Sequence, residues 1–160
     1  MKSNARLFLL RVVTFVLLCI ASGVTTRAVV HVYSGAYAYS SRIMYTWDGE
    51  HLYSGAYAHS SEILYTFDGK HVYSGPYKYS SNIRYTWDGK HLYAGSYAYS
   101  SKILCTIANG HIYSGGYTDS SNILYTFDGE HLYSGAYKYS SNILLTFDGP
   151  FPKALLPVIL

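Results

Sequence analysis

The sequence has few cysteines, prolines and charged residues, and each scarcity excludes a class of protein. Only two cysteines occur in 160 residues, Cys19 and Cys105, which excludes a scaffold held by several disulfides. Four prolines, and fourteen glycines that follow no three-residue period, exclude a collagen-like fibre. Charged residues make up 13% and aromatic residues 18% of the chain, the reverse of the composition of disordered proteins. We therefore expect one packed domain.

Positive charge is concentrated at the start of the chain. The formal net charge is +3, but Lys2, Arg6, Arg11 and Arg27 precede residue 28 with no acidic residue among them. The remaining residues carry eight Lys or Arg and nine Asp or Glu, which gives a net charge of −1. The sequence therefore predicts no basic surface for nucleic acid.

The first 28 residues have the pattern of a secretory signal peptide. A basic segment, 1–11, precedes an apolar segment, 12–21, and small residues at 21–23 and 26–28 suit signal peptidase. The pattern predicts a protein that is secreted, periplasmic or on the cell surface. An uncleaved membrane anchor is the alternative, although Arg11 leaves the apolar run shorter than the ~20 residues that span a bilayer. Removal of the signal would leave Cys105 alone, which predicts a buried small hydrophobic residue or, as the alternative, intermolecular pairing.

Six copies of a twenty-residue unit fill residues 31–150. The copies begin at His31, His51, His71, His91, His111 and His131. The unit reads H-[VLI]-Y-S-G-x-Y-x-x-S-S-x-I-L-Y-T-[FW]-D-G-x, and we number its positions 1 to 20. Positions 1–4 and 13–17 alternate and are rich in β-branched and aromatic residues, which is typical of strands. We expect two strands in each copy, about twelve in all, with a longer surface loop at positions 5–11 in which the serines cap local amides.

An Asp-Gly dipeptide at the end of most copies predicts a two-residue type I′ hairpin turn. In the segment 67–70 this turn places Phe67 opposite Lys70, and it places Thr66 opposite His71. Positions 13, 15, 17 and 2 then share one face, and positions 14, 16, 1 and 3 share the other. Both faces carry apolar side chains, so a single copy needs neighbours and does not fold alone.

The repeats predict an all-β fold of tandem hairpins. Our first choice is an open stack, solenoid-like or a curled sheet, and the alternative is a closed barrel or a propeller-like ring. Three four-stranded blades are too few for a typical propeller, so that arrangement would require oligomerisation. The segment 150–152, with prolines at both ends, is expected to end the strand pairing and protect the last edge. The apolar tail, 151–160, is expected to pack over the last strands.

Two copies depart from the unit. In the fourth copy Ile107-Ala108-Asn109-Gly110 displaces the turn by one residue and Cys105 replaces a tyrosine, so we expect the weakest hairpin there. In the third copy Arg84 replaces leucine, which predicts a partly exposed position.

The run SSNILYTFDG, which ends at Gly129 and recurs nearly intact before Gly149, resembles the short tandem repeats of certain uncharacterised bacterial exported proteins. The resemblance covers the six copies and implies a repeat type and export, but no activity. The length and aromatic content are also similar, loosely, to choline-binding repeats of cell-wall proteins. Their paired-tryptophan signature is absent, because only Trp47 and Trp87 occur.

No residue pattern indicates catalysis, a metal or another cofactor. Stacked hairpins would space the position 1 histidines by ~9 to 10 Å, which is too far for neighbours to share a metal. One turn aspartate in twenty residues is too isolated for calcium, and turn formation already explains it. Repetition would also give the histidines six equivalent environments without a distinct orienting acid. We therefore expect a protein that is not an enzyme.

The tyrosines are the remaining candidates for binding. Those at positions 3 and 15 belong to strands and are expected in the core or in cross-strand contacts. Those at position 7 lie in the longer loops and are the tentative binding residues: Tyr37, Tyr57, Tyr77, Tyr97, Tyr117 and Tyr137. Loop tyrosines at position 9 accompany them in four copies: Tyr39, Tyr79, Tyr99 and Tyr139. The alternative is that these rings fold back and cover the sheet.

The sequence thus predicts an exported, non-enzymatic repeat protein with a structural, adhesive or protein-interaction role. The alternative is a glycan- or cell-wall-binding module that uses the loop tyrosines. Envelope polysaccharide or a protein surface would be the partner, and self-association stays open.

Overall fold

The structure is a computed structural model that describes residues 28–160. In these residues the strands are β1 (Val30–Ser34), β2 (Ile43–Trp47), β3 (His51–Ser54), β4 (Ile63–Phe67), β5 (His71–Ser74), β6 (Ile83–Trp87), β7 (His91–Ala94), β8 (Ile103–Ala108), β9 (His111–Ser114), β10 (Ile123–Phe127), β11 (His131–Ser134) and β12 (Ile143–Phe147). The 3-10 helices are η1 (Ser40–Arg42), η2 (Ser60–Glu62), η3 (Ser80–Asn82), η4 (Ser100–Lys102), η5 (Ser120–Asn122), η6 (Ser140–Asn142) and η7 (Lys153–Val158). Two strands form in every copy, as predicted. The predicted signal peptide lies, apart from residue 28, outside the described residues.

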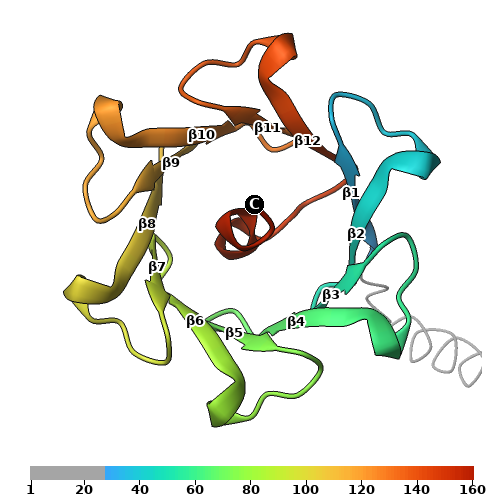
Figure 1. Cartoon of the computed structure of the whole chain (residues 1–160), viewed down its shortest axis with the longest axis horizontal. Helices are drawn as coiled ribbons and strands as arrows, with labels where there is room; N and C mark the ends of the chain where they lie inside the picture. The colour runs from blue at the N-terminus through green and yellow to red at the C-terminus, as the bar shows by residue number, and fades with distance from the viewer. Residues whose placement is uncertain (1–27) are drawn as a thin grey trace, which may run out of the picture.

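The twelve strands close into an antiparallel barrel, which Figure 1 shows as a ring with six outward loops. Each strand pairs with its neighbours in sequence, and β1 pairs with β12. The closed barrel is confirmed and the open stack is wrong. Closure satisfies the backbone groups that two free edges would expose, so no last edge is left for the segment 150–152 to protect.

The pairing across the Asp-Gly turns differs from the predicted register. Phe67 lies opposite Val72 rather than Lys70, so four residues, 68–71, separate the last two paired residues, and His71 is the first residue of β5. Gly69 has a φ of 96°, but no aspartate of the described residues has a positive φ, so the turn is not type I′. The register has moved by an even number of residues, so positions 2, 15 and 17 keep their predicted shared face. Position 13 does not, because a register shift places Ile63 opposite Tyr53, a residue predicted on the other face.

The fourth copy has the tight turn that was predicted for the others. Asn109 and Gly110 have φ values of 51° and 77°, and Ala108 pairs with His111 across a two-residue loop. The pairing of β8 with β9 has four register positions, whereas β4 and β5 have three. The displaced turn thus does not shorten the strand pairing, and the weakness of this hairpin stays a prediction. Arg84 is exposed, as predicted.

The loops contain one 3-10 turn each, at positions 10–12, after which the chain enters the second strand. None of the six turns, η1 to η6, has a side-chain hydrogen bond at its cap. The predicted capping by serines is therefore wrong. The backbone closes these turns instead, for example with the Arg42 amide donating to the Tyr39 carbonyl at 2.8 Å.

Positions 2, 15 and 17 of every copy form the inner wall of the barrel. The position 2 side chains are between 0% and 2% exposed: Val32, Leu52, Val72, Leu92, Ile112 and Leu132. Aromatic side chains at positions 15 and 17 pack against the same core. Cys105 is buried on this wall, as predicted for a small hydrophobic residue.

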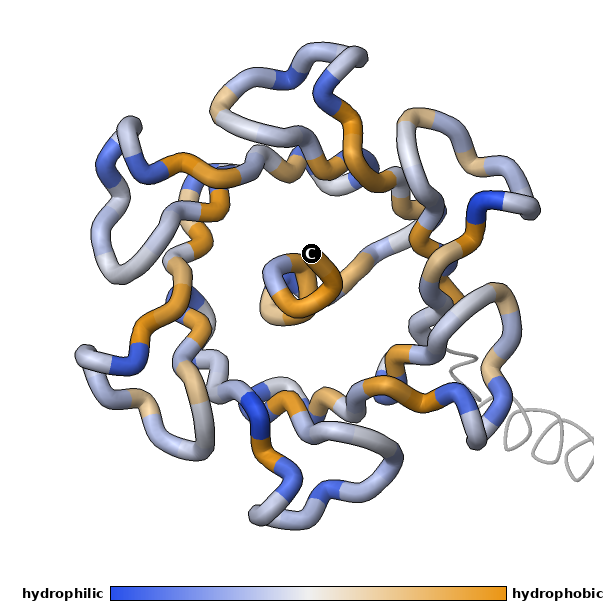
Figure 2. Tube along the Cα trace, in the orientation of Figure 1, coloured by the Kyte–Doolittle hydropathy of each residue, from blue (hydrophilic) through white to orange (hydrophobic). Residues whose placement is uncertain are grey.

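The apolar tail fills the centre of the barrel. η7 lies inside the ring in Figure 1, and Figure 2 shows it as a largely hydrophobic segment surrounded by hydrophobic strands. Leu155 and Leu156 are fully buried, and the Phe151 ring lies 6.3 Å from Trp47 and 5.0 Å from Phe147. The predicted packing over the last strands is wrong, because the inner faces of all six copies converge on one lumen and leave the tail an apolar surface there.

Candidate functional site

An aspartate at position 18 anchors the start of the following copy at five of the six junctions. The residues are Asp48, Asp68, Asp88, Asp128 and Asp148. Oδ1 of Asp48 accepts hydrogen bonds from the amides of Glu50 at 2.8 Å and His51 at 2.7 Å. Oδ2 accepts a hydrogen bond from the hydroxyl of Tyr53 at 2.7 Å. Both oxygens of the carboxylate therefore hold the turn in place.

Four of these aspartates lie within 4 Å of the Nδ1 atom of a position 1 histidine. Nδ1 of His91 is 3.0 Å from Oδ2 of Asp88, and Nδ1 of His51 is 3.4 Å from Oδ2 of Asp48. The prediction that no acid orients the histidines is wrong, because the four-residue connection brings the side chains at its two ends together. The predicted cross-strand partner is wrong: Thr66 lies opposite Tyr73 rather than His71, and a different histidine, His51, lies opposite Thr66.

The hydrogen bonds shift the pKa values of the aspartates and of the tyrosines bonded to them. Burial alone would raise the pKa of Asp48, but hydrogen bonds from the His51 amide and the Tyr53 hydroxyl outweigh it and lower the pKa below its usual value. The pKa of each of the other four aspartates is lowered in the same way. Burial and the neighbouring carboxylate raise the pKa of Tyr53 to about 12. Neither the carboxylate nor the hydroxyl is set to exchange a proton near neutral pH.

The fourth junction lacks this cluster. Ala108 stands at position 18, and Nδ1 of His111 lies 3.0 Å from the hydroxyl of Thr126 instead. Within residues 28–160, no group of three or more His, Cys, Asp and Glu side chains is arranged to hold a metal ion. No helix of that same part is long and apolar enough to cross a membrane.

The predicted binding tyrosines all lie on the outward loops. The six position 7 side chains are between 60% and 77% exposed: Tyr37, Tyr57, Tyr77, Tyr97, Tyr117 and Tyr137. The six tyrosines at position 3, by contrast, are between 6% and 8% exposed. The loop rings therefore do not fold back over the sheet, and the alternative that they cover it is wrong.

Most of the loop tyrosines are paired with a second ring two residues later. In four copies both rings are tyrosines, with centroids between 5.5 and 5.7 Å apart and planes tilted by between 30° and 33°. In the second copy Tyr57 pairs with His59 at 5.8 Å. In the fifth copy Asp119 occupies the second position. The outer rim thus presents aromatic pairs at regular intervals.

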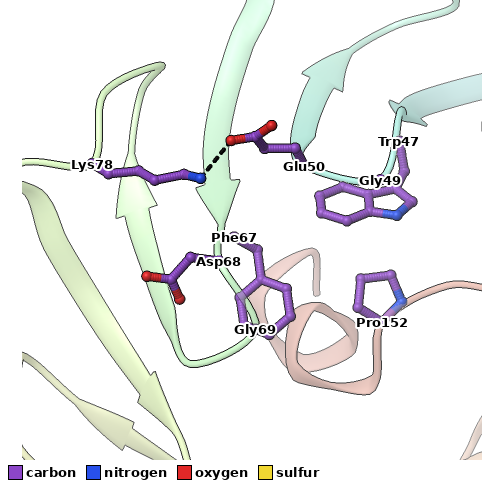
Figure 3. Close-up of a pocket in the computed structure, with 8 residues that line it drawn as sticks. All are labelled: Trp47, Gly49, Glu50, Phe67, Asp68, Gly69, Lys78 and Pro152. Atoms are coloured by element: carbon purple, nitrogen blue, oxygen red, sulfur yellow. Dashed lines mark ion pairs between the residues drawn. The ribbon is translucent and has the colours of Figure 1, made fainter. Parts of the chain in front are cut away.

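Shallow pockets lie around the two ends of the tail, and the loop residue Lys78 lines one of them. One of about 380 Å³ is enclosed by two neighbouring Asp-Gly turns and Pro152 (Figure 3). Its rim carries an ion pair in which Nζ of Lys78 lies 2.5 Å from Oε1 of Glu50. Another, of about 370 Å³, is lined by side chains that include Tyr65 and Ile159. Neither pocket is lined by a predicted loop tyrosine.

The family comparison agrees with this architecture. A family model described as the 6-fold beta flower protein matches residues 32–159. The chain belongs to the 6-fold beta flower family. The match supports the tandem-repeat part of the resemblance seen in the sequence, and the similarity to choline-binding repeats stays a prediction. No curated protein and no solved structure matches the chain significantly.

Two features of this beta flower were missed in the sequence. The first is the bond between the position 18 aspartate and the position 3 tyrosine of the next copy, for example Asp68 with Tyr73 at 2.7 Å. A signal for it was available, because the two residues recur five positions apart. The second is the central place of the tail, for which only its apolar composition gave a signal.

Proposed function

We propose that this beta flower is an exported, non-enzymatic attachment protein whose six loops bind a protein surface through their tyrosines. The exposure of the position 7 tyrosines in every copy, between 60% and 77%, is the observation that carries the proposal. Large aromatic side chains on a rigid support give much contact area at a small loss of conformational entropy, and they are common at binding surfaces.

Repetition of the loops supports attachment rather than a single binding site. Six equivalent loops point outward around one ring (Figure 1), so several can contact an extended partner at once. After the first loop binds, the next binds at a high effective concentration, which strengthens attachment without any new type of contact. A weak contact at each loop is therefore sufficient.

The polar groups of the barrel support a role without catalysis. The position 18 carboxylates accept hydrogen bonds that hold the turns, as those of Asp48 do from the His51 amide and the Tyr53 hydroxyl. The cluster is also repeated with little variation, whereas an active site combines groups with different roles.

Replacement of all six position 7 tyrosines by alanine tests the proposal. Wild-type protein should be retained on a preparation of bacterial cell envelope, and the sixfold variant should be lost from it. The matched control replaces six exposed serines of the same loops by alanine: Ser41, Ser61, Ser81, Ser101, Ser121 and Ser141. Equal retention of the tyrosine variant and the wild type would contradict a role for the loops.

The aromatic pairs favour a second candidate, the binding of envelope polysaccharide. Two tilted rings beside small polar residues, as at Tyr77 and Tyr79, offer apolar faces on which sugar rings could stack. Protease treatment of the envelope preparation separates the candidates. Loss of retention after this treatment supports a protein partner, whereas persistence, followed by loss after glycan hydrolysis, supports polysaccharide.

A further inference from the structure

The twenty tyrosines fall into two groups of equal size that differ in their access to solvent. Ten lie on the loops and are between 56% and 77% exposed: Tyr37, Tyr39, Tyr57, Tyr77, Tyr79, Tyr97, Tyr99, Tyr117, Tyr137 and Tyr139. The other ten belong to the barrel wall, six buried at position 3 and four half-buried at position 15. We infer that the loop tyrosines are sites of oxidative phenol coupling, through which one ring becomes covalently joined to another. This modification goes beyond the non-covalent attachment proposed above.

The placement of the loop phenols suits a reaction between molecules. The loops form the outermost part of the ring in six directions (Figure 1), so loops of two molecules can meet without hindrance from the barrel. In four loops a second phenol stands with its centroid 5.5 to 5.7 Å from the first. A radical formed on either ring of such a pair therefore has a second phenol in contact with it, which doubles the exposed carbons at which coupling can occur.

The coupling step balances with a peroxide as oxidant. Hydrogen peroxide, used by a haem peroxidase, removes one electron and one proton from each of two tyrosine hydroxyl groups. The two phenoxyl radicals form a carbon–carbon bond between their ortho positions, and the two ring hydrogens at these carbons move to the oxygens as the rings regain aromaticity. The peroxide accepts the two electrons and two protons, its O–O bond breaks, and two molecules of water leave.

The wall tyrosines are excluded from this reaction, those at position 3 by burial and those at position 15 because they face inward. The hydroxyl of Tyr73 donates to Asp68 at 2.7 Å, and its ring is 7% exposed, so its ortho carbons cannot reach a ring of another molecule. The tyrosines at position 15 face the core of the barrel. Cys105 is buried, and burial raises the pKa of its thiol to about 11, which suppresses the reactive thiolate.

The test treats the purified wild-type protein with hydrogen peroxide and horseradish peroxidase. We expect covalent multimers on a reducing gel, dityrosine fluorescence, and cross-linked peptides that contain loop tyrosines only. A variant with all ten loop tyrosines replaced by phenylalanine keeps the rings but lacks the phenols, and it should give neither multimers nor fluorescence. The matched control replaces the four position 15 tyrosines, Tyr45, Tyr65, Tyr85 and Tyr125, by phenylalanine and should couple as the wild type does.

Two results would overturn the inference. One is a wild type that stays monomeric under these conditions while a mixture of free tyrosine is coupled, and the other is a set of cross-links that map to the wall. Attachment is measured separately, as retention of the unoxidised protein on the envelope preparation. A protein that is retained but does not couple refutes only this inference, and one that couples without being retained refutes only the proposed function.

Discussion

Two kinds of junction hold the six copies together. Five junctions are joined by the chain, and the sixth, between β12 and β1, is joined by contacts alone; we call it the seam. At the chain-joined junction of Asp48, the carboxylate accepts bonds from the next amide and tyrosine, both at 2.7 Å. At the seam, Asp148 accepts the same two bonds at 2.6 and 2.9 Å. The seam thus has the same hydrogen bonds as a chain-joined junction, although no covalent link crosses it. Contacts between copies are therefore enough to form this arrangement.

The junctions differ in what their glycines do. Gly69, at a chain-joined junction, has a φ of 96° and open space where a Cβ would stand, so glycine serves the backbone conformation. Gly149, at the seam, has no such φ, but a Cβ there would lie 2.9 Å from Cγ2 of Val30. From Gly149 the chain turns into the lumen instead of into a further copy. Close packing at the seam therefore replaces the turn.

Deletion of the tail, residues 151–160, should reduce the stability of the protein more than any other change. It should also make the seam behave differently from the chain-joined junctions. Leu155 and Leu156 are fully buried, and each buried leucine contributes about 1.5 to 3 kcal/mol, which is a large share of the ~5 to 15 kcal/mol that stabilises a typical domain. The empty lumen should leave the seam as the first junction to open. We expect loss of a cooperative thermal transition by circular dichroism, together with binding of a hydrophobic dye.

The control for this deletion is Lys153→Ala, which changes an exposed side chain of the same segment. A truncated protein with the wild-type melting temperature would mean that the junctions need no central support.

Acid should weaken the seam and the chain-joined junctions alike. The pKa values of the five aspartates are lowered in the folded protein, so their stabilisation is complete above about pH 4 and is lost as the pH falls through the folded pKa values. Because these carboxylates are partly exposed, we expect roughly 0.5 to 1 kcal/mol for each. Melting temperatures between neutral pH and about pH 2 measure the effect.

The variants Asp68→Asn and Asp148→Asn sharpen this test, because each removes one titrating group. Both should reduce the loss of stability in acid by the same amount. A reduction seen only with Asp148→Asn would show that the seam depends on its carboxylate more than the other junctions do.

Replacement of one buried threonine at a chain-joined junction, or of one at the seam, should have an intermediate effect on stability. The hydroxyl of Thr66 donates to the carbonyl of Gly75 at 2.7 Å, and that of Thr146 donates to Gly35 across the seam at 2.7 Å. Thr66→Val and Thr146→Val each leave a carbonyl without its donor, at a cost of about 1 to 3 kcal/mol. Urea unfolding should give equal losses; a much larger loss for Thr146→Val would mean that the two junctions are not equivalent.

The two glycines should show the smallest effects, with different causes. Gly149→Ala should destabilise the protein by about 1 kcal/mol through its clash with Val30, and Val30→Ala should relieve that clash in the double variant. Gly69→Ala should lose about 1 kcal/mol through backbone strain. No neighbouring side chain causes that strain, so adding Val30→Ala to Gly69→Ala should leave the loss of stability unchanged. If Val30→Ala restored stability to both glycine variants, the two glycines would not differ in the way proposed.

The strands and their faces were predictable because their signal is local. Alternation at positions 1–4 placed Leu52 and Tyr53 on opposite faces, and both side chains are buried, Leu52 in the core and Tyr53 with its hydroxyl bonded to Asp48. The register was not predictable from the Asp-Gly dipeptide. The side chain of Asp48 accepts hydrogen bonds from two backbone amides of its own turn. These bonds stabilise a longer connection than the two-residue turn that the dipeptide predicts.

The candidate site was predictable in part. The loop position of Tyr37 followed from its place between two strand patterns, but its exposure and its contact with the Tyr39 ring depend on how the loop leaves the barrel. The same limit applies to the histidine environments, since a repeat pattern does not say which side chains meet across a junction.

The sequence alone determined the number of strands, the apolar character of both their faces and the need of each copy for neighbours, because these follow from alternation and repetition along the chain. Only the tertiary structure decided that the copies close into a ring and that the tail occupies its centre. Closure depends on whether the twist and tilt of successive hairpins bring β12 back to β1, and those angles arise from contacts between copies rather than from any one unit.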